Sequence, residues 1–173
     1  MKRRLLTGAV AVIAGAFAVA GCQGGAADLT QAETPHVRVG YPKGWQRADD
    51  GQRLTVRKQE GGRTVAQLVV LERVTKATTA DLAVNAVQAG KFAQQDYQRG
   101  SAKKVKVNGA KDARRLDYTY TSVDGGTRQP ASGTDVVAVV DRDVYVVRVT
   151  GLKDQLKQAD VDAIVKSIEL KEG

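Results

Sequence analysis

Two valine-rich segments on either side of a short polar turn constrain the fold of this chain more than any other feature. They are TDVVAVV (134–140) and VYVVRVT (144–150), and Asp141-Arg142-Asp143 separates them. Valine packs well on a pleated sheet, and two such runs around a tight turn predict a pair of neighbouring strands. A third segment, 63–74, is apolar on both faces near its centre, which is typical of a central strand covered on both sides.

Shorter segments with alternating polarity add further strands. HVRVGYP (36–42) and GQRLTVRKQ (51–59) alternate, and so do the two arms of 103–121, which contain the strong hairpin turn Asn108-Gly109. Together the predicted strands should bury the following side chains in one sheet: Leu68, Val70, Leu116, Tyr118, Val137, Val139 and Val147.

Two segments change to a helical period. Residues 78–100 predict a long helix that ends at Gly100, and 160–170 predict a short helix capped by Asp160. The apolar stripe expected to face the core of the long helix consists of Leu82, Ala86, Ala89, Ala93 and Tyr97, flanked by Val87 and Phe92.

The order of these elements is three strands, a helix, four strands and a helix. It predicts an α+β fold, in which a mainly antiparallel sheet of about seven strands is covered by one long and one short helix. The segment 124–133, DGGTRQPASG, is expected to be a long polar connection between strands.

The N-terminus has the order of a secretory signal. Met1–Arg4 is cationic, Leu5–Ala20 carries no charge, and the only cysteine of the chain, Cys22, follows directly after Gly21. Val19-Ala20-Gly21-Cys22 resembles the lipobox of bacterial lipoprotein signal peptides. That resemblance implies cleavage before Cys22 and a lipid anchor on its thiol. An uncleaved anchor, or a secreted protein with a free thiol, is the alternative.

The chain therefore divides into a cleaved signal peptide (1–21), a lipidated Cys22 with a flexible linker (22–35) and a single domain (36–173). The expected location is the cell membrane, on the extracytoplasmic side. The precursor has 27 Lys and Arg against 19 Asp and Glu, and loss of the three basic residues at positions 2–4 lowers the net charge to +5. This moderate charge does not indicate nucleic-acid binding, whereas anionic lipid headgroups and wall polymers lie beside an anchored protein.

Four segments resemble a known family when they are taken in order. VRVGYPKGWQR (37–47), the helical segment in the middle of the chain, VNGAKDARRLDY (107–118) and VDAIVKSIEL (161–170) are similar to a PsbP-like domain. With the signal sequence they resemble the LpqN/LpqT-type lipoproteins of actinobacteria. The resemblance implies a three-layer α/β/α sandwich that serves as a binding or accessory module outside the membrane, with no cofactor common to the fold.

The residues offer few components for catalysis. His36 is the only histidine, so a nucleophile–histidine–carboxylate triad lacks a well-placed base, and we expect no catalytic residues. A metal site would depend on carboxylates alone, and we expect none. The carboxylate pairs, each of which is explained as a turn or helix-cap pair, are Asp49-Asp50, Asp141 with Asp143, and Asp160 with Asp162.

Three surfaces are candidates for binding. Lys104, Lys106, Arg114 and Arg115 lead a basic cluster on one hairpin, which is either a site or an edge strand guarded against aggregation. Tyr41 and Trp45 surround a turn and either pack beneath the sheet or form an exposed anchor for a partner. Arg128 lies in the polar connection 124–133.

Two functions follow from the sequence. The first is a lipid-anchored, non-enzymatic binding or adaptor protein of the bacterial cell envelope, whose partner is an envelope protein, an anionic lipid or a wall polymer. The second is an envelope hydrolase, or another enzyme, that uses the aspartates interpreted above as turn residues. A pocket in which two aspartates with raised pKa values converge would favour the second function.

Overall fold

The computed structural model describes residues 28–49 and 53–171. In chain order these residues form β1 (Leu29–Glu33), β2 (Val37–Pro42), β3 (Gln46–Asp49), β4 (Leu54–Glu60), β5 (Arg63–Leu71), α1 (Ala80–Gln88), the 3₁₀ turn η1 (Ala89–Lys91), β6 (Gln98–Lys104), β7 (Asp112–Asp124), β8 (Thr127–Val140), β9 (Asp143–Leu152), α2 (Gln158–Ser167) and β10 (Glu169–Leu170). The predicted signal peptide, Cys22 and Asp50 lie outside the described residues.

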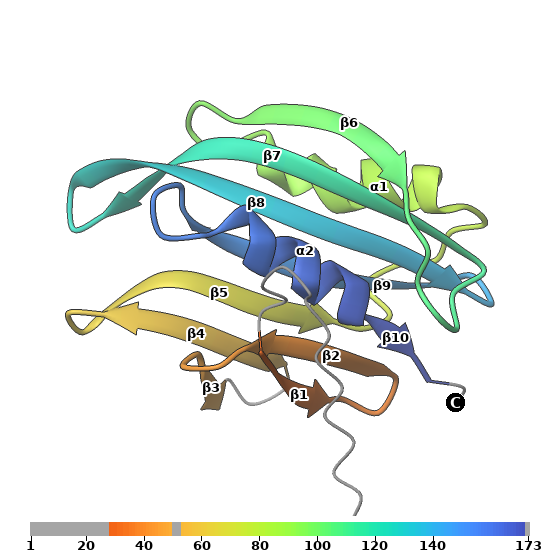
Figure 1. Cartoon of the computed structure of the whole chain (residues 1–173). Helices are drawn as coiled ribbons and strands as arrows, with labels where there is room; N and C mark the ends of the chain where they lie inside the picture. Colours follow the sequence, from red (N-terminus) through yellow and green to blue (C-terminus); the bar gives the residue numbers. More distant parts are fainter. Residues whose placement is uncertain (1–27, 50–52, 172–173) are drawn as a thin grey trace, which may run out of the picture.

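The strands form two antiparallel sheets. The large sheet has the order β3-β4-β5-β9-β8-β7-β6, and the small sheet has the order β1-β2-β10. Helix α1 covers one face of the large sheet, whereas α2 and the small sheet cover the other face (Figure 1). The predicted α+β sandwich with a mainly antiparallel sheet is confirmed.

Strand β8 shows how one sheet supplies two cores. Val136 and Ala138 point into the core under α2 and the small sheet, whereas Val137 and Val139 point into the core under α1. Successive side chains of a strand alternate between its two faces, so the valine-rich part of β8 is buried on both faces of the sheet. All seven side chains predicted for the core are buried, from Leu68 at 0% exposure to Tyr118 at 4%.

Two-residue turns connect the long strands. Asp141 and Arg142 both have positive φ between β8 and β9, and Gly125 and Gly126 do the same between β7 and β8. These are the angles of a type I′ turn, whose twist matches that of paired strands. The prediction of a long connection over 124–133 is therefore wrong, because β8 begins at Thr127 and pairs with every residue of β7.

Helix α1 is shorter than predicted and presents a different face to the sheet. It ends at Gln88, and its buried side chains include Ala83 and Val84, whereas Leu82 is 58% exposed and Phe92 is 64% exposed. Apolar residues occur on both sides of this helix, so the sequence alone did not fix its rotation.

Contacts at the N-terminus of α1 determine which side faces the sheet. The hydroxyl of Thr79 accepts a hydrogen bond from the backbone N–H of Leu82 (3.4 Å), and the carboxylate of Asp112 on β7 accepts one from the N–H of Ala80 (2.9 Å). Arg114 on β7 also pairs with Asp81. The contacts with Asp112 and Arg114 orient the first turn of the helix toward β7.

The small sheet includes residues at both ends of the described chain. Leu29–Glu33, predicted as linker, form β1 because their backbone pairs with β2 from Leu29↔Pro42 to Glu33↔Arg38. Glu169 and Leu170 leave the predicted helix to form β10, which pairs with the other side of β2. Asp160 lies in the first turn of α2 and does not cap it, since the N-cap residue is Lys157.

Candidate functional site

A cleft of about 430 Å³ lies where the end of the small sheet meets the β8–β9 turn. We call it the His36 cleft. It is lined by His36, Arg73, Gly109, Val140, Asp141, Asp143, Tyr145, Leu170 and Lys171. These residues come from five separate parts of the chain, so only the complete fold creates the cleft.

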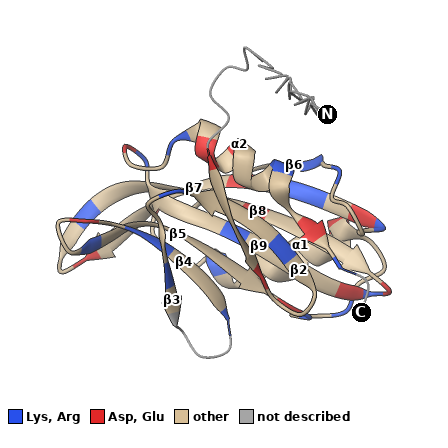
Figure 2. Cartoon of the chain, turned by 60° about the horizontal axis from the view of Figure 1, so that its bottom comes forward, with Lys and Arg blue, Asp and Glu red and all other residues tan. Residues whose placement is uncertain are grey.

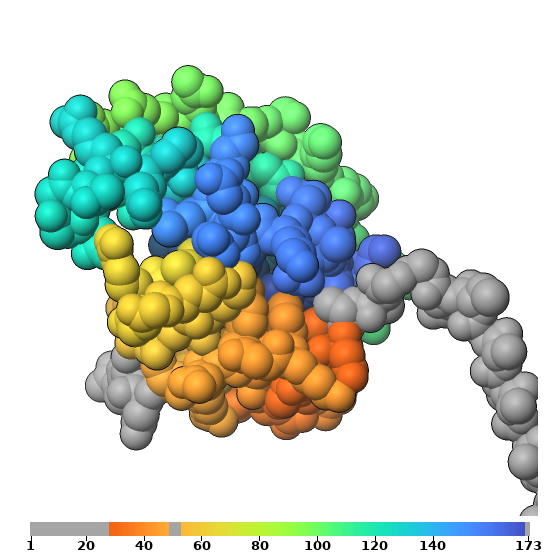
Figure 3. All heavy atoms as spheres, turned by 60° about the vertical axis from the view of Figure 1, so that its left-hand side comes forward, coloured from red at the N-terminus to blue at the C-terminus, as the bar shows by residue number. Residues whose placement is uncertain are grey.

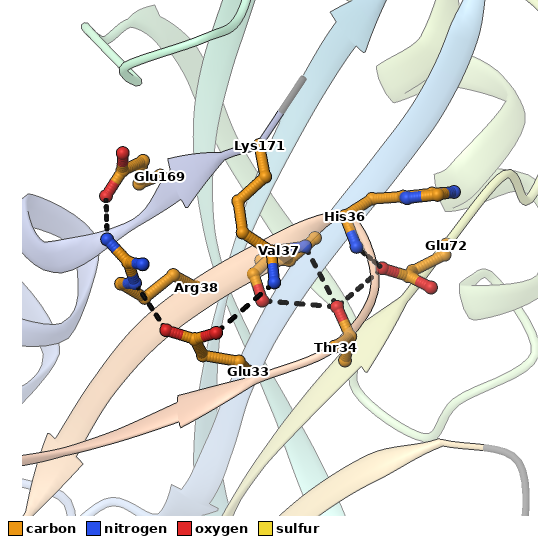
Figure 4. Close-up of polar contacts among 8 residues, drawn as sticks. All are labelled: Glu33, Thr34, His36, Val37, Arg38, Glu72, Glu169 and Lys171. Atoms are coloured by element: carbon orange, nitrogen blue, oxygen red, sulfur yellow. Dashed lines mark hydrogen bonds and ion pairs between the residues drawn. The ribbon is translucent and has the colours of Figure 1, made fainter. Parts of the chain in front are cut away.

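The backbone of His36 is fixed on both sides. Glu72, directly after β5, accepts hydrogen bonds from the hydroxyl of Thr34 (2.5 Å) and from the N–H of His36 (3.1 Å). The carbonyl of His36 accepts a hydrogen bond from the N–H of Lys171 (2.9 Å). Figure 4 shows the imidazole pointing away from the ion pairs between Arg38 and its neighbouring glutamates. The ring meets Tyr145 edge-on, with centroids 6.0 Å apart.

Asp143 and Arg73 form the charged part of the cleft. Asp143 pairs with the ammonium of Lys76 and lies 3.6 Å from the guanidinium of Arg73. The hydrogen bond from Lys76 keeps the pKa of Asp143 below its usual value. Arg73 has a φ of 49°, unusual for a residue other than glycine, and its Nε donates to the hydroxyl of Tyr145 (3.4 Å).

The predicted turn pair Asp141 and Asp143 therefore converges on the cleft together with the only histidine. The direction of the pKa shift does not match a general acid, because a carboxylate whose pKa is lowered stays ionised at neutral pH. The charges of Asp143 and Lys171 are also compensated, by Lys76 and by Glu33 respectively. A cleft that offers both donors and acceptors with balanced charge can bind a polar ligand.

The predicted basic face does not form as one surface. Arg114 and Arg115 are neighbours on β7 and point to opposite faces of the sheet. Arg114 pairs with Asp81 and Asp112, and Arg115 pairs with Asp117 and Asp162. Their side chains are only 17% and 16% exposed. The expectation that both arginines belong to an exposed cluster is wrong, because alternation along the strand separates them.

The lysines of the same hairpin do remain together. Lys104, Lys106 and Lys111 are exposed at the rim of a groove of about 460 Å³, and Figure 2 shows basic residues along the neighbouring strand β6. The remaining residues that line the groove are Val105, Val107, Ala110, Asp112 and Ala113. We call this feature the lysine groove.

Trp45 and Tyr41 pack instead of projecting. Trp45 is 7% exposed and belongs to the core between the two sheets, and the partly buried Tyr41 packs against the same core. Of the two interpretations of this turn, the structure supports the packed one. Gly44, with a φ of 90°, allows the chain to turn before Trp45.

Arg128 is exposed on the β7–β8 hairpin. That hairpin stands beside the β4–β5 hairpin, with a hollow between the two (Figure 3), and a groove of about 400 Å³ is lined by residues of β5, β7, β8 and β9. An ion pair between Arg63 and Asp124 (2.8 Å) connects the two hairpins.

Sequence reasoning missed a buried charge cluster under α1. The carboxylate of Asp135 is fully buried and accepts hydrogen bonds from Gln88 (3.0 Å), Lys91 (2.8 Å), Tyr118 (3.1 Å) and Arg148 (2.9 and 3.0 Å). Burial lowers the pKa of Lys91 to about 8, although the negative charge of Asp135 opposes this shift.

A signal for this cluster was present in the sequence. A two-residue turn at Asp141-Arg142 pairs Asp143 with Val140, and the same register places Asp135 opposite Arg148. Each valine-rich segment contains one charged residue, Asp135 in the first and Arg148 in the second, so the pairing of the two strands places these residues side by side.

Within the described residues, no three histidine, cysteine or acidic side chains gather in a way that could bind a metal ion. In the same part of the chain, no helix has the length and apolar character needed to span a bilayer.

No protein-family model matches this chain. No curated protein matches it either.

The fold is shared with solved structures at low sequence identity. LpqN of Mycobacterium tuberculosis, described as involved in cell envelope biogenesis, is 14% identical, with a TM-score of 0.52 over 84% of this chain and 91% of that one. A protein of Bacteroides thetaiotaomicron is 12% identical, with a TM-score of 0.51 over 79% of this chain but only 45% of its own length. A protein of unknown function from Pseudomonas aeruginosa, PA94, a putative regulator, is 15% identical with a TM-score of 0.47, over 74% of this chain and 85% of that one. The first two similarities establish a related fold.

Proposed function

We propose that this chain is a lipid-anchored, non-enzymatic binding or adaptor protein of the bacterial cell envelope, attached through Cys22 on the extracytoplasmic side. The lipobox-like sequence before Cys22 supports the attachment. The fold shared with LpqN, an envelope biogenesis protein, supports the location. The narrower assignment to PsbP-like, LpqN/LpqT-type lipoproteins is part of the same proposal.

The His36 cleft carries the binding part of the proposal. It offers Arg73 and Lys171 as donors, Asp141 and Asp143 as acceptors, and the rings of His36 and Tyr145 as an aromatic wall. The ligand that fits such a cleft is polar, and a wall polymer or an envelope protein can supply it.

Attachment is tested first. The Cys22→Ser variant should incorporate no radiolabelled palmitate, because a hydroxyl does not replace the thiolate that accepts the lipid. Incorporation equal to that of the wild type would contradict the anchor.

Binding is tested in cells with a photo-crosslinking amino acid at Arg73, which is exposed at the cleft. Val123 is the matched control position, since it is also exposed but lies at the far end of β7. We expect a defined envelope partner to be captured from position 73 and not from position 123. Equal capture from both positions would remove the cleft from the proposal.

One observation favours the enzymatic alternative, namely that Asp141 and Asp143 meet beside His36. An envelope hydrolase of this kind would lose its activity in the Asp143→Asn variant. Turnover of a wall or lipid ester by the purified protein, abolished by this variant, would replace the binding proposal.

A further inference from the structure

The lysine groove has an apolar floor and a basic rim. Val105 and Val107 alternate with Lys104 and Lys106 along the chain, so the valines pack on the core while the lysines point outward. Val107 is 5% exposed and Ala113 on the floor is 2% exposed. The groove therefore rests on the rigid core between the two sheets.

The rim carries an excess of positive charge, because three lysines and the carboxylate of Asp112 line the groove. Among the described residues, the ammonium groups of Lys104, Lys106 and Lys111 form no ion pair. Asp112, the one carboxylate in the groove, is already engaged with Arg114 (2.6 Å) and with the N–H of Ala80 (2.9 Å). Charge is thus balanced on both faces of β7 but not at this rim.

The loop that carries the rim is anchored to the small sheet. The carbonyl of Asn108 accepts a hydrogen bond from the N–H of Leu170 (2.8 Å). Gly109 lies so close to the same backbone that a Cβ at this position would be 2.0 Å from the carbonyl oxygen of Leu170. The basic rim is therefore held in one position. Gly109 also lines the His36 cleft, so residues of one loop border both the cleft and the groove.

The length of chain before β1 limits how far the domain can move from an anchor. Leu29, the first residue of β1, lies seven positions after Cys22, and an extended chain spans at most about 25 Å over that length. A domain of this size has a radius of gyration of about 15 Å. An anchored domain would therefore remain beside the membrane, where anionic phospholipid headgroups complement the lysine rim.

We propose that the lysine groove docks on the anionic phospholipid surface of the membrane, with Lys104, Lys106 and Lys111 contacting headgroup phosphates. The docking rests on the attachment proposed above.

The test uses the unlipidated chain from Gln23 onward, which contains every described element, and vesicles of phosphatidylcholine with and without phosphatidylglycerol. Each lysine near an anionic surface changes the partition coefficient by about five-fold. The Lys104→Gln/Lys106→Gln/Lys111→Gln variant should therefore bind anionic vesicles about 100-fold more weakly at low salt. Wild-type binding should also weaken as salt is added, because the charges are screened within about 10 Å.

The matched control is Lys153→Gln/Lys157→Gln/Lys166→Gln, which removes the same charge from exposed lysines on and before α2. We expect this control to bind within a few-fold of the wild type. Equal losses of vesicle binding in both triple variants would assign the effect to net charge. No loss in either would mean that the lysines of the groove only protect an edge strand against aggregation. Both outcomes overturn the proposal.

Inorganic polyphosphate serves as a probe for a wall polymer. Lysine-dependent binding of polyphosphate without binding to anionic vesicles would assign the groove to a polymer and overturn membrane docking. The assay uses no lipid on Cys22, so its result is independent of the palmitate test. Circular dichroism of each variant verifies that a loss of binding is not a loss of fold.

Discussion

The Asp135→Asn substitution tests the energetics of the buried charge cluster. The carboxylate is 0% exposed and neutralises Lys91 and Arg148, whose side chains are 7% and 25% exposed. The amide that replaces it carries no charge and presents its own N–H groups to donors. Removing one partner of a buried ion pair costs about 3–5 kcal/mol, because the other charge stays buried without compensation.

The two cations respond differently to this loss. Lys91 has a pKa of about 8 even beside the carboxylate, so it can become neutral at low cost. Arg148 cannot, because a guanidinium stays protonated. We therefore expect the free energy of unfolding, measured by urea denaturation, to fall by about 3–5 kcal/mol. The expected decrease in melting temperature is roughly 6–20 °C.

Asp124→Asn is the matched control. Asp124 forms an ion pair with Arg63, but its side chain is 70% exposed, and an exposed pair contributes less than about 1 kcal/mol. If Asp135→Asn also costs less than about 1 kcal/mol, the reasoning about the cluster is refuted. A triple variant with Leu at 135 and Met at 91 and 148 should recover much of the loss, because apolar replacement removes the uncompensated charges.

Three further predictions concern the core, the Asn108-Gly109 turn and pH. Leu116→Ala should lower the free energy of unfolding by about 2–5 kcal/mol, since Leu116 is fully buried, and a much smaller loss in urea denaturation would mean that the site collapses without a cavity. Gly109→Ala should lower the melting temperature more than Gly61→Ala, because both residues have positive φ but only Gly109 lies against the backbone of Leu170; equal shifts by calorimetry would contradict this. The pKa of Lys91 is about 8 in the folded chain, and its ordinary value is 10.5. Between these two pH values the unfolded chain therefore binds more protons than the folded chain, and the free energy of unfolding should rise with pH. Above pH 10 the raised pKa of the Tyr118 hydroxyl acts in the opposite sense. Urea denaturation from pH 7 to pH 10 measures the rise, which should be absent in Lys91→Met.

The strands were predictable because their side chains repeat with a period of two. The valine runs indicated two buried faces, and the turn at Asp141-Arg142 fixed the register of β8 and β9. The rotation of α1 was not predictable, because its orientation depends on contacts with Asp112 and Arg114 on a strand that is distant in sequence. β1 was missed because LTQAE has no apolar period and is held mainly by backbone pairing with β2.

The candidate sites were predictable only in part. The sequence indicated a basic hairpin, and the alternation of side chains along β7 would already have separated Arg114 from Arg115. The His36 cleft could not be derived from the sequence, because Arg73, Asp143 and Lys171 meet only through the pairing of three distant segments.

The position of β10 beside β2 has a consequence for the order of folding. Arg38 and Glu169 pair in this sheet although they lie 131 positions apart in the sequence. Closing a loop of that length costs about 2 kcal/mol more than closing a ten-residue loop. During synthesis, β2 is complete long before its neighbour β10 exists, so the small sheet must be among the last parts of the fold to close. Until then, the edge of β2 and the Gly109 turn lack the backbone that covers them, and an incomplete chain would expose them to aggregation.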